Sequence, residues 1–155
     1  MNAGPYSDAK VQKYIQDEFI PIKSECFWDK RTELMKQFDI AWTPTLLVHD
    51  PQGREHHRVV GFLPNDDFLA QLKLGRGKTF FNRFRFAEAI QEFSAAIEQH
   101  PNAGATPEII FFLGVAKYWK THDPKGLRWA YDTLAARFPQ SEWARRAEPY
   151  KQIPL

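Results

Sequence analysis

The sequence has 155 residues, of which 43% are hydrophobic and 26% charged, a composition that is typical of globular proteins and excludes a disordered chain. Its net charge of +2 is spread too thinly for a nucleic-acid-binding face, because residues 1–75 hold 9 basic against 11 acidic residues and residues 76–155 hold 12 against 8. No apolar run approaches the roughly 18 residues of a membrane span, and no secretory signal opens the chain. The single cysteine, Cys26, excludes an internal disulfide, so we expect a cytoplasmic protein with no membrane contact.

The first third of the chain has the patterns of two short helices with a strand between them. Apolar residues recur at helical spacing over residues 7–18 and again over residues 30–38, which predicts two amphipathic helices. The apolar run over residues 19–23 is too short for a helix and has β-branched character. We therefore expect a buried strand there.

A β-hairpin and a longer helix follow. Residues 45–49 form an apolar strand pattern, Asp50–Gly53 has the composition of a turn, and residues 57–61 predict the returning strand. Asn65 begins a helical pattern that we expect to end at Gly75.

The order of these elements resembles the thioredoxin fold over roughly residues 7–74. The match depends on the motif Thr43-Pro44-Thr45 before a strand, on the hairpin turn, and on Gly61 before the closing helix. The resemblance implies a cis peptide bond before Pro44. It also implies a groove at Thr43, Pro44 and Thr45 that faces the active site in that family.

The chain departs from that family in its cysteines and in one strand. The chain begins in the second half of the helix that carries Cys-x-x-Cys in a thioredoxin, and Cys26 stands far from that position. The resemblance therefore carries over no thiol chemistry and no catalytic residue. The family's central strand, between residues 19–23 and residues 45–49, is absent as well. Three solutions are open: the two strands pair directly, another chain supplies the strand, or the sequence is part of a longer protein. We favour the last two, because an open strand edge is a site of association.

The second half resembles the tetratricopeptide repeat, a 34-residue unit of two helices. A first copy begins at Gly77 and a second, less regular copy at Pro107, with 37 residues separating Gly77 from Gly114. Small residues are expected to let the helices approach, and phenylalanines to fill the space between them. Ser141 precedes a last helical pattern over residues 142–150, which would cover the open end of the repeats. The first copy is carried by Gly77, Phe80, Ala89, Phe93, Ala96 and Pro101.

Other motifs have plainer interpretations. Gly77-Lys78-Thr79 lacks the first glycine of a phosphate-binding loop. Basic and aromatic residues mix over residues 78–86, as in an RNA-binding strand, but the repeat places them on a helix, so we expect no nucleic acid. His49, His56 and His57 have no metal-ligand spacing, and adjacent strand residues point to opposite faces. We expect a surface hairpin there, with no metal and no cofactor.

These patterns predict an α/β fold followed by an all-α one. Residues 1–75 would form a thioredoxin-like domain with an incomplete sheet and flanking helices, and residues 76–155 about two tetratricopeptide-like helix hairpins with a capping helix. The preferred hypothesis is a redox-inactive adaptor that binds a protein or peptide, similar in architecture to bacterial thioredoxin–tetratricopeptide co-chaperones. Its groove candidates are Lys78, Asn82, Lys117 and Lys120, and the lysines suit an acidic segment or a C-terminal carboxylate.

Two rival hypotheses stay open. In one, the chain is part of a thioredoxin-family thiol–disulfide oxidoreductase whose catalytic cysteines lie upstream of Pro5, and Pro44 shapes the substrate groove. In the other, the chain is a small subunit held by its open sheet edge, either to a strand-supplying partner or to further copies of itself.

Overall fold

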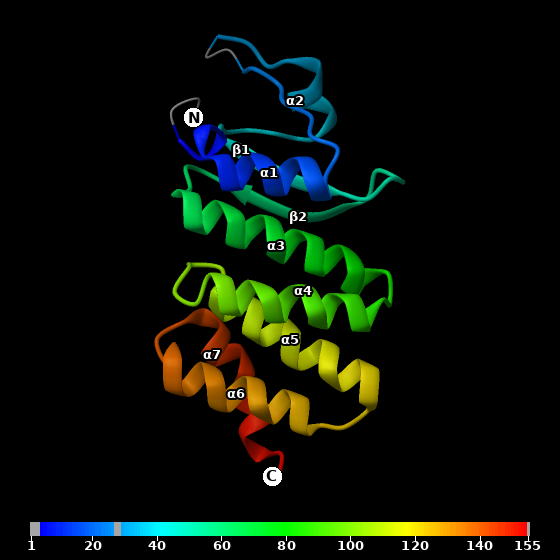
Figure 1. Ribbon diagram of the computed structural model, residues 1–155, viewed down its shortest axis with the longest axis vertical. Helices are drawn as coiled ribbons and strands as arrows, with labels where there is room; N and C mark the ends of the chain where they lie inside the picture. Colours follow the sequence, from blue (N-terminus) through cyan, green and yellow to red (C-terminus); the bar gives the residue numbers. More distant parts are fainter. Residues whose placement is uncertain (1–3, 27–28, 155) are drawn as a thin grey trace.

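The computed structural model describes residues 4–26 and 29–154. A β-hairpin and two short helices lie at one end, and a stack of helices continues to the other end (Figure 1). The expected α/β start followed by an all-α part is therefore confirmed. In chain order the elements are the 3₁₀ helix η1 (Pro5–Ser7), α1 (Ala9–Glu18), α2 (Glu33–Gln37), β1 (Thr45–His49), β2 (Glu55–Val60), α3 (Asn65–Asn82), α4 (Phe86–Gln99), α5 (Thr106–Thr121), α6 (Lys125–Arg137), α7 (Glu142–Ala147) and the 3₁₀ helix η2 (Glu148–Gln152).

Helix α1 packs across the first half of α3. Asp8 caps its N-terminus: the Asp8 carboxylate accepts hydrogen bonds from the backbone N–H groups of Lys10 and Val11 and so satisfies two free helix donors. Val11 is fully buried in a cluster with Phe68 and Leu72 of α3. The predicted amphipathic helix over residues 7–18 is thus confirmed apart from its first two residues.

Strands β1 and β2 form an antiparallel hairpin whose sheet packs on α3. Thr45 lies opposite Val60, and the register shifts by a bulge between Val48 and His49. The approach of α3 is close: a Cβ added to Gly75 would lie 2.6 Å from the Cγ2 atom of Val48. Gly75 is therefore needed for packing between helix and sheet.

The strand predicted over residues 19–23 is wrong. Within the described residues the sheet has two strands, β1 and β2, and residues 19–26 belong to no helix or strand. Ile20 is 94% exposed and Ile22 83% exposed, so this apolar segment is not buried either. A strand requires a hydrogen-bonded neighbour, and the part of the chain that the structure describes places no strand beside this segment.

The helix end predicted at Gly75 is also wrong, because α3 continues through Gly75 and Gly77 to Asn82. Gly77 also lies at a close approach between helices, since a Cβ added there would overlap the ring of Phe93 in α4. The division of the chain at residues 75 and 76 falls inside this helix, and it stays a prediction.

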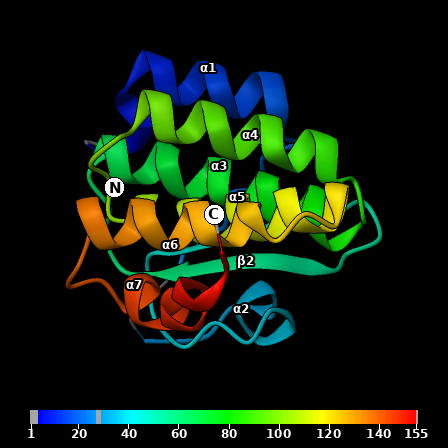
Figure 2. The ribbon, with the colours of Figure 1, turned by 90° about the horizontal axis from the view of Figure 1, so that it is seen from below.

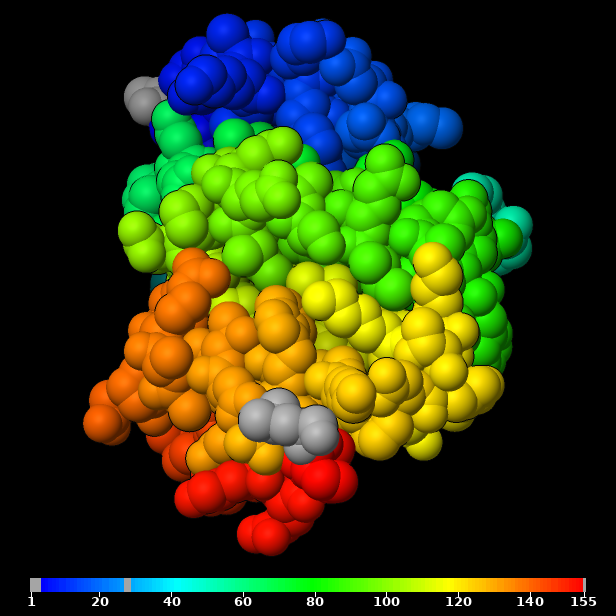
Figure 3. Space-filling model, turned by 60° about the horizontal axis from the view of Figure 1, so that its bottom comes forward, coloured from blue at the N-terminus to red at the C-terminus, as the bar shows by residue number. Residues whose placement is uncertain are grey.

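The remaining helices pack in sequence, α3 on α4, α4 on α5 and α5 on α6, with α7 against α5 and α6. Figure 2 shows α1 and α4 on one side of α3, with β2, α7 and α2 on the other, and Figure 3 shows α4, α5 and α6 as successive bands on one face. Glycine again sets the closest approach, because a Cβ added to Gly114 in α5 would lie 2.5 Å from the Cβ of Ala130 in α6. The buried core of α3, α4 and α5 contains Ala70, Leu74, Ala89, Phe93, Ala96, Ala103, Ala105, Ile109 and Leu113.

Candidate protein-binding site

The motif Thr43-Pro44-Thr45 forms the turn that leads into β1. The peptide bond between Thr43 and Pro44 is cis, as the resemblance to thioredoxins implies. The Thr45 hydroxyl donates a hydrogen bond to the carbonyl of Trp42 at 2.6 Å, and the Gly61 N–H donates to the Pro44 carbonyl at 2.8 Å. The second of these bonds joins the motif to the residue that follows β2.

Three large apolar side chains are exposed at this end of the sheet. Trp42 is 68%, Val60 57% and Phe62 65% exposed. The pairing of Thr45 with Val60 brings the residues that follow β2 next to those that precede β1. We name Trp42, Val60 and Phe62 the hairpin-end patch. Large apolar side chains exposed at the same end of a sheet are candidates for a site of interaction.

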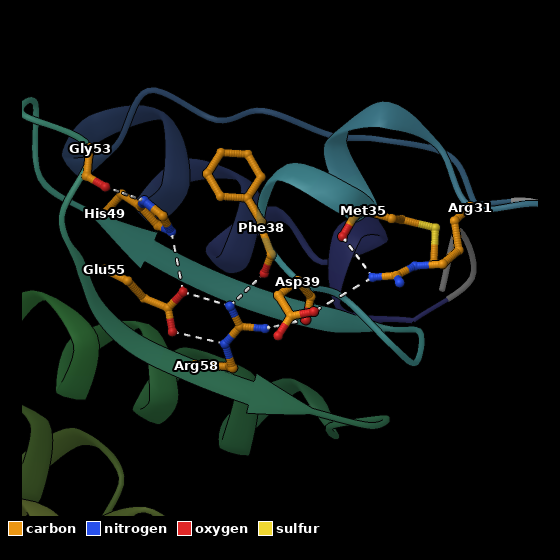
Figure 4. Close-up of polar contacts among 8 residues, drawn as sticks. All are labelled: Arg31, Met35, Phe38, Asp39, His49, Gly53, Glu55 and Arg58. Carbon is orange, nitrogen blue, oxygen red and sulfur yellow. Dashed lines mark hydrogen bonds and ion pairs between the residues drawn. The ribbon is translucent and has the colours of Figure 1, made fainter.

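The opposite face of the sheet from α3 is covered by the segment that carries α2. Figure 4 shows the polar contacts that hold it there. The Arg58 guanidinium donates to the backbone carbonyls of Phe38 at 2.7 Å and Asp39 at 3.3 Å, and also binds both carboxylate oxygens of Glu55. We name this arrangement the Arg58 clamp. These hydrogen bonds and ion pair lower the pKa of Glu55, so its carboxylate stays charged and keeps the guanidinium in place.

His49 lies beside the clamp, with its ring edge against Phe38 at 5.0 Å between centroids. Its Nδ1 lies 3.1 Å from the Gly53 carbonyl, and its Nε2 lies 3.6 Å from a carboxylate oxygen of Glu55 (Figure 4). Among the described residues this Nε2 is buried with no hydrogen-bond partner.

His56 is buried, which corrects the interpretation of a surface hairpin. Its Nε2 lies 3.0 Å from the Asp50 carboxylate, and its Nδ1 lies 3.0 Å from the Asn82 side-chain amide nitrogen at the end of α3. Because an amide nitrogen can only donate, Nδ1 accepts and Nε2 carries the proton toward Asp50. The His56 side chain is 0% exposed, so this chain of bonds fastens the hairpin to α3 and offers no open catalytic base.

His57 is buried as well, against α3. Its Nε2 lies 2.7 Å from the side-chain oxygen of Gln71, and burial lowers its pKa below the usual value near 6.5. From the sequence alone, these histidines were expected at the surface. Their burial depends on helix α3, which packs on the hairpin and supplies Gln71 and Asn82 as hydrogen-bond partners.

The predicted groove residues lie on α3 and α5 but face different neighbours. Lys78 forms an ion pair with Glu108, and Asn82 binds His56. The Lys117 ammonium lies 3.8 Å from the ring centroid of Trp129 in α6, and burial lowers its pKa. Lys120 is exposed. The structure therefore brings three of these side chains into contacts within the molecule, and their role in a common groove stays a prediction.

A family model described as a thioredoxin-like domain matches residues 6–76. No curated protein and no solved structure matches the chain. The match begins within η1, covers α1, α2, the hairpin and the first two-thirds of α3, and supports a thioredoxin-like domain in this part of the molecule.

Two further observations concern the described residues alone. None of their helices is both long and apolar enough to pass through a membrane. Nor do three or more His, Cys, Asp or Glu side chains come together among them in a way that could hold a metal ion.

Proposed function

We propose that this chain is a protein-binding adaptor in which a redox-inactive thioredoxin-like part is joined to a tetratricopeptide-like helical part. The observation that carries the proposal is the hairpin-end patch, where Trp42, Val60 and Phe62 are each more than half exposed beside the Thr43-Pro44-Thr45 turn. Apolar side chains in such numbers at one place favour a partner with an extended apolar segment.

The tetratricopeptide-like interpretation is supported by the helix pairs α3–α4 and α5–α6. Each pair has a glycine at the closest approach, Gly77 against Phe93 and Gly114 against Ala130, as steric packing of the repeat requires. We propose the groove of Lys78, Asn82, Lys117 and Lys120 as a second, weaker contact surface. Lys120 is its most accessible member, because the other three have partners within the molecule.

The redox-inactive assignment follows from the cysteine count. The sequence contains one cysteine, Cys26, which is exposed, so this chain cannot cycle between a dithiol and an internal disulfide. In an insulin-reduction assay with dithiothreitol we expect the chain and its Cys26→Ser variant to give the same rate as buffer. A rate clearly above buffer that Cys26→Ser removes would contradict the assignment.

Client binding can be tested by the suppression of aggregation of a heat-unfolded model protein, followed by light scattering. We expect the chain to suppress scattering and the double variant Trp42→Ser/Phe62→Ser to lose most of that effect. The matched control is Phe84→Ser, because Phe84 is 78% exposed in the turn between α3 and α4, outside the patch. Equal loss in the patch and control variants would refute a specific role for the hairpin-end patch.

The rival hypothesis, part of a thiol–disulfide oxidoreductase, is supported by the thioredoxin-like match over residues 6–76. It requires a Cys-x-x-Cys segment encoded upstream of the first codon. Reading about 100 bases of that coding sequence decides between the two hypotheses, since a strand pattern ending in Cys-x-x-Cys would replace the adaptor with the oxidoreductase.

A further inference from the structure

One segment of the chain has the composition of a strand, but among residues 4–26 and 29–154 no strand pairs with it. Residues 19–25 read Phe-Ile-Pro-Ile-Lys-Ser-Glu, and their apolar side chains Ile20 and Ile22 are 94% and 83% exposed. Exposed β-branched residues in an irregular segment are unusual, because this residue type is favoured where a pleated, half-buried surface accepts it.

The hairpin offers a sheet edge that could accept this segment. Strand β1 pairs with β2 on one side and, within the described residues, with no strand on the other. The residues of β1, Thr45–His49, include no Asp, Glu, Lys or Arg, whereas β2 carries Glu55 and Arg58 on the other edge of the sheet. Charged residues discourage pairing at a sheet edge, so β1 is the more receptive of the two.

We propose that two copies of the chain associate by reciprocal strand addition, with residues 19–25 of each copy pairing with β1 of the other. The proposed partner is a second copy of the chain, because the added segment (residues 19–25) and the accepting strand β1 belong to the same chain but do not pair with each other within it. A two-fold arrangement uses both pairs at once. Pro21 lacks an N–H group, and it is tolerated because the added segment becomes the new edge strand, where that position can face solvent. This association uses the free edge of β1, whereas the proposed client binding uses the side chains of the hairpin-end patch.

The native cysteine allows a direct measurement. Cys26 is exposed and directly follows residues 19–25. Two fluorescent dyes suited to energy transfer can therefore be attached to separate samples of the whole chain without new cysteines. We expect energy transfer in the mixture to rise with total concentration and to fall when unlabelled chain is added. Light scattering on the unlabelled chain should show the same concentration range for the change from one to two times 18.1 kDa.

The decisive variant is Ile20→Asp/Ile22→Asp. Both side chains are exposed in the single chain, so the substitution leaves the fold intact, which circular dichroism checks. We expect association at least tenfold weaker than in the parent chain, while Phe84→Asp, an equally exposed site outside residues 19–25, associates normally. A chain that stays monomeric at the highest soluble concentration would overturn the proposal. So would a dimer that the isoleucine variant leaves unchanged, or that both variants weaken equally. Retained aggregation suppression by Ile20→Asp/Ile22→Asp would show that the two surfaces act separately.

Discussion

At the scale of single residues, the hydrogen bonds of Asp50 and His56 determine how the hairpin is held. The Asp50 carboxylate accepts from the backbone N–H groups of Gln52 and Arg54 at 3.0 and 2.9 Å, and from His56. With the His56 hydrogen bond as the largest cause, these contacts lower the pKa of Asp50 to about 2. Asn82 then extends the connection to α3.

The pH dependence of stability follows from this depressed pKa. A carboxyl group whose pKa is about 2 when folded and about 4 when unfolded stabilises the fold fully above about pH 4, and that contribution is lost as the pH falls toward 2. We expect urea midpoints of the parent chain to fall over this range more steeply than those of Asp50→Asn. Parallel curves for the two proteins would show that Asp50 contributes no such dependence.

His57 supplies a second test with the same sign, at higher pH. Burial lowers its pKa below 6.5, so the folded chain binds this proton less readily than the unfolded chain. Stability is therefore complete above about pH 6.5 and decreases as the pH falls through the window down to the folded pKa. An NMR titration should give a His57 midpoint below 6.5 in the folded protein, and a midpoint above 6.5 would contradict burial of the ring as the dominant influence on its pKa.

At the scale of elements, glycines control how closely the helices pack. Gly114 leaves no room for a side chain, because an added Cβ would lie 2.5 Å from the Cβ of Ala130 and 2.7 Å from the backbone oxygen of Gly126. Backbone cannot move aside as the end of a flexible side chain can. The same residue in an unconstrained helix would be expected to gain stability on replacement by alanine.

We expect Gly114→Ala to lower the free energy of unfolding by about 1–3 kcal/mol, despite the roughly 1 kcal/mol that alanine gains in helix propensity. Urea unfolding followed by circular dichroism measures the change. Gly104→Ala is the control, since the one near atom there is an Asp67 carboxylate oxygen at 3.3 Å, and it should change stability by less than about 0.5 kcal/mol. A stabilising effect of Gly114→Ala would show that α5 and α6 are less tightly packed.

The attachment of α2 depends on the Arg58 clamp. Removing the guanidinium in Arg58→Ala leaves the carbonyls of Phe38 and Asp39 without these donors. The side chain is about one-third exposed, so we expect a loss of roughly 1 kcal/mol, seen as about fivefold faster amide exchange in α2. Arg54→Ala, in the exposed hairpin turn, should leave exchange in α2 unchanged; equal acceleration in both variants would refute the clamp.

The local sequence pattern was sufficient to predict most helices and the hairpin. It was not sufficient for features that depend on contacts with residues distant in the sequence. The helix around Val11 and the hairpin follow from spacing and turn composition, and the structure has both. Residues 19–23 have strand composition, but pairing depends on a second strand that local pattern cannot supply. Gly75 was predicted to end a helix, but α3 continues through it, and the glycine instead leaves room for the side chain of Val48. The burial of His56 depends on Asn82, which is 26 residues away in sequence, and no local signal reports it.

At the scale of the whole molecule, α3 is shared between the hairpin and the helical stack. Leu74 of α3 and Ile109 of α5 belong to one buried core, while Gly75, the next residue of α3, contacts the sheet. Partial unfolding of α3 would therefore remove contacts both with the hairpin and with the helical stack. The two parts of the chain are therefore expected to unfold together.

Ile109→Val tests this coupling with a mild change in a fully buried side chain. We expect a loss of about 0.5–1.5 kcal/mol. Under native conditions, amide exchange should then accelerate by the same factor in β1 and β2 as in α4 and α5, measured by mass spectrometry. Acceleration confined to the helices would show that the two parts unfold independently.

Helix α3 also sets a fixed spacing within the molecule. Its 18 residues span about 27 Å at 1.5 Å per residue, with Asp66 near one end and Asn82 bound to the hairpin at the other. A partner that touches both the hairpin-end patch and the exposed face near Lys120 must therefore match one separation and one angle. If both surfaces contact one partner, we expect that partner to be selected by its length as much as by its chemistry.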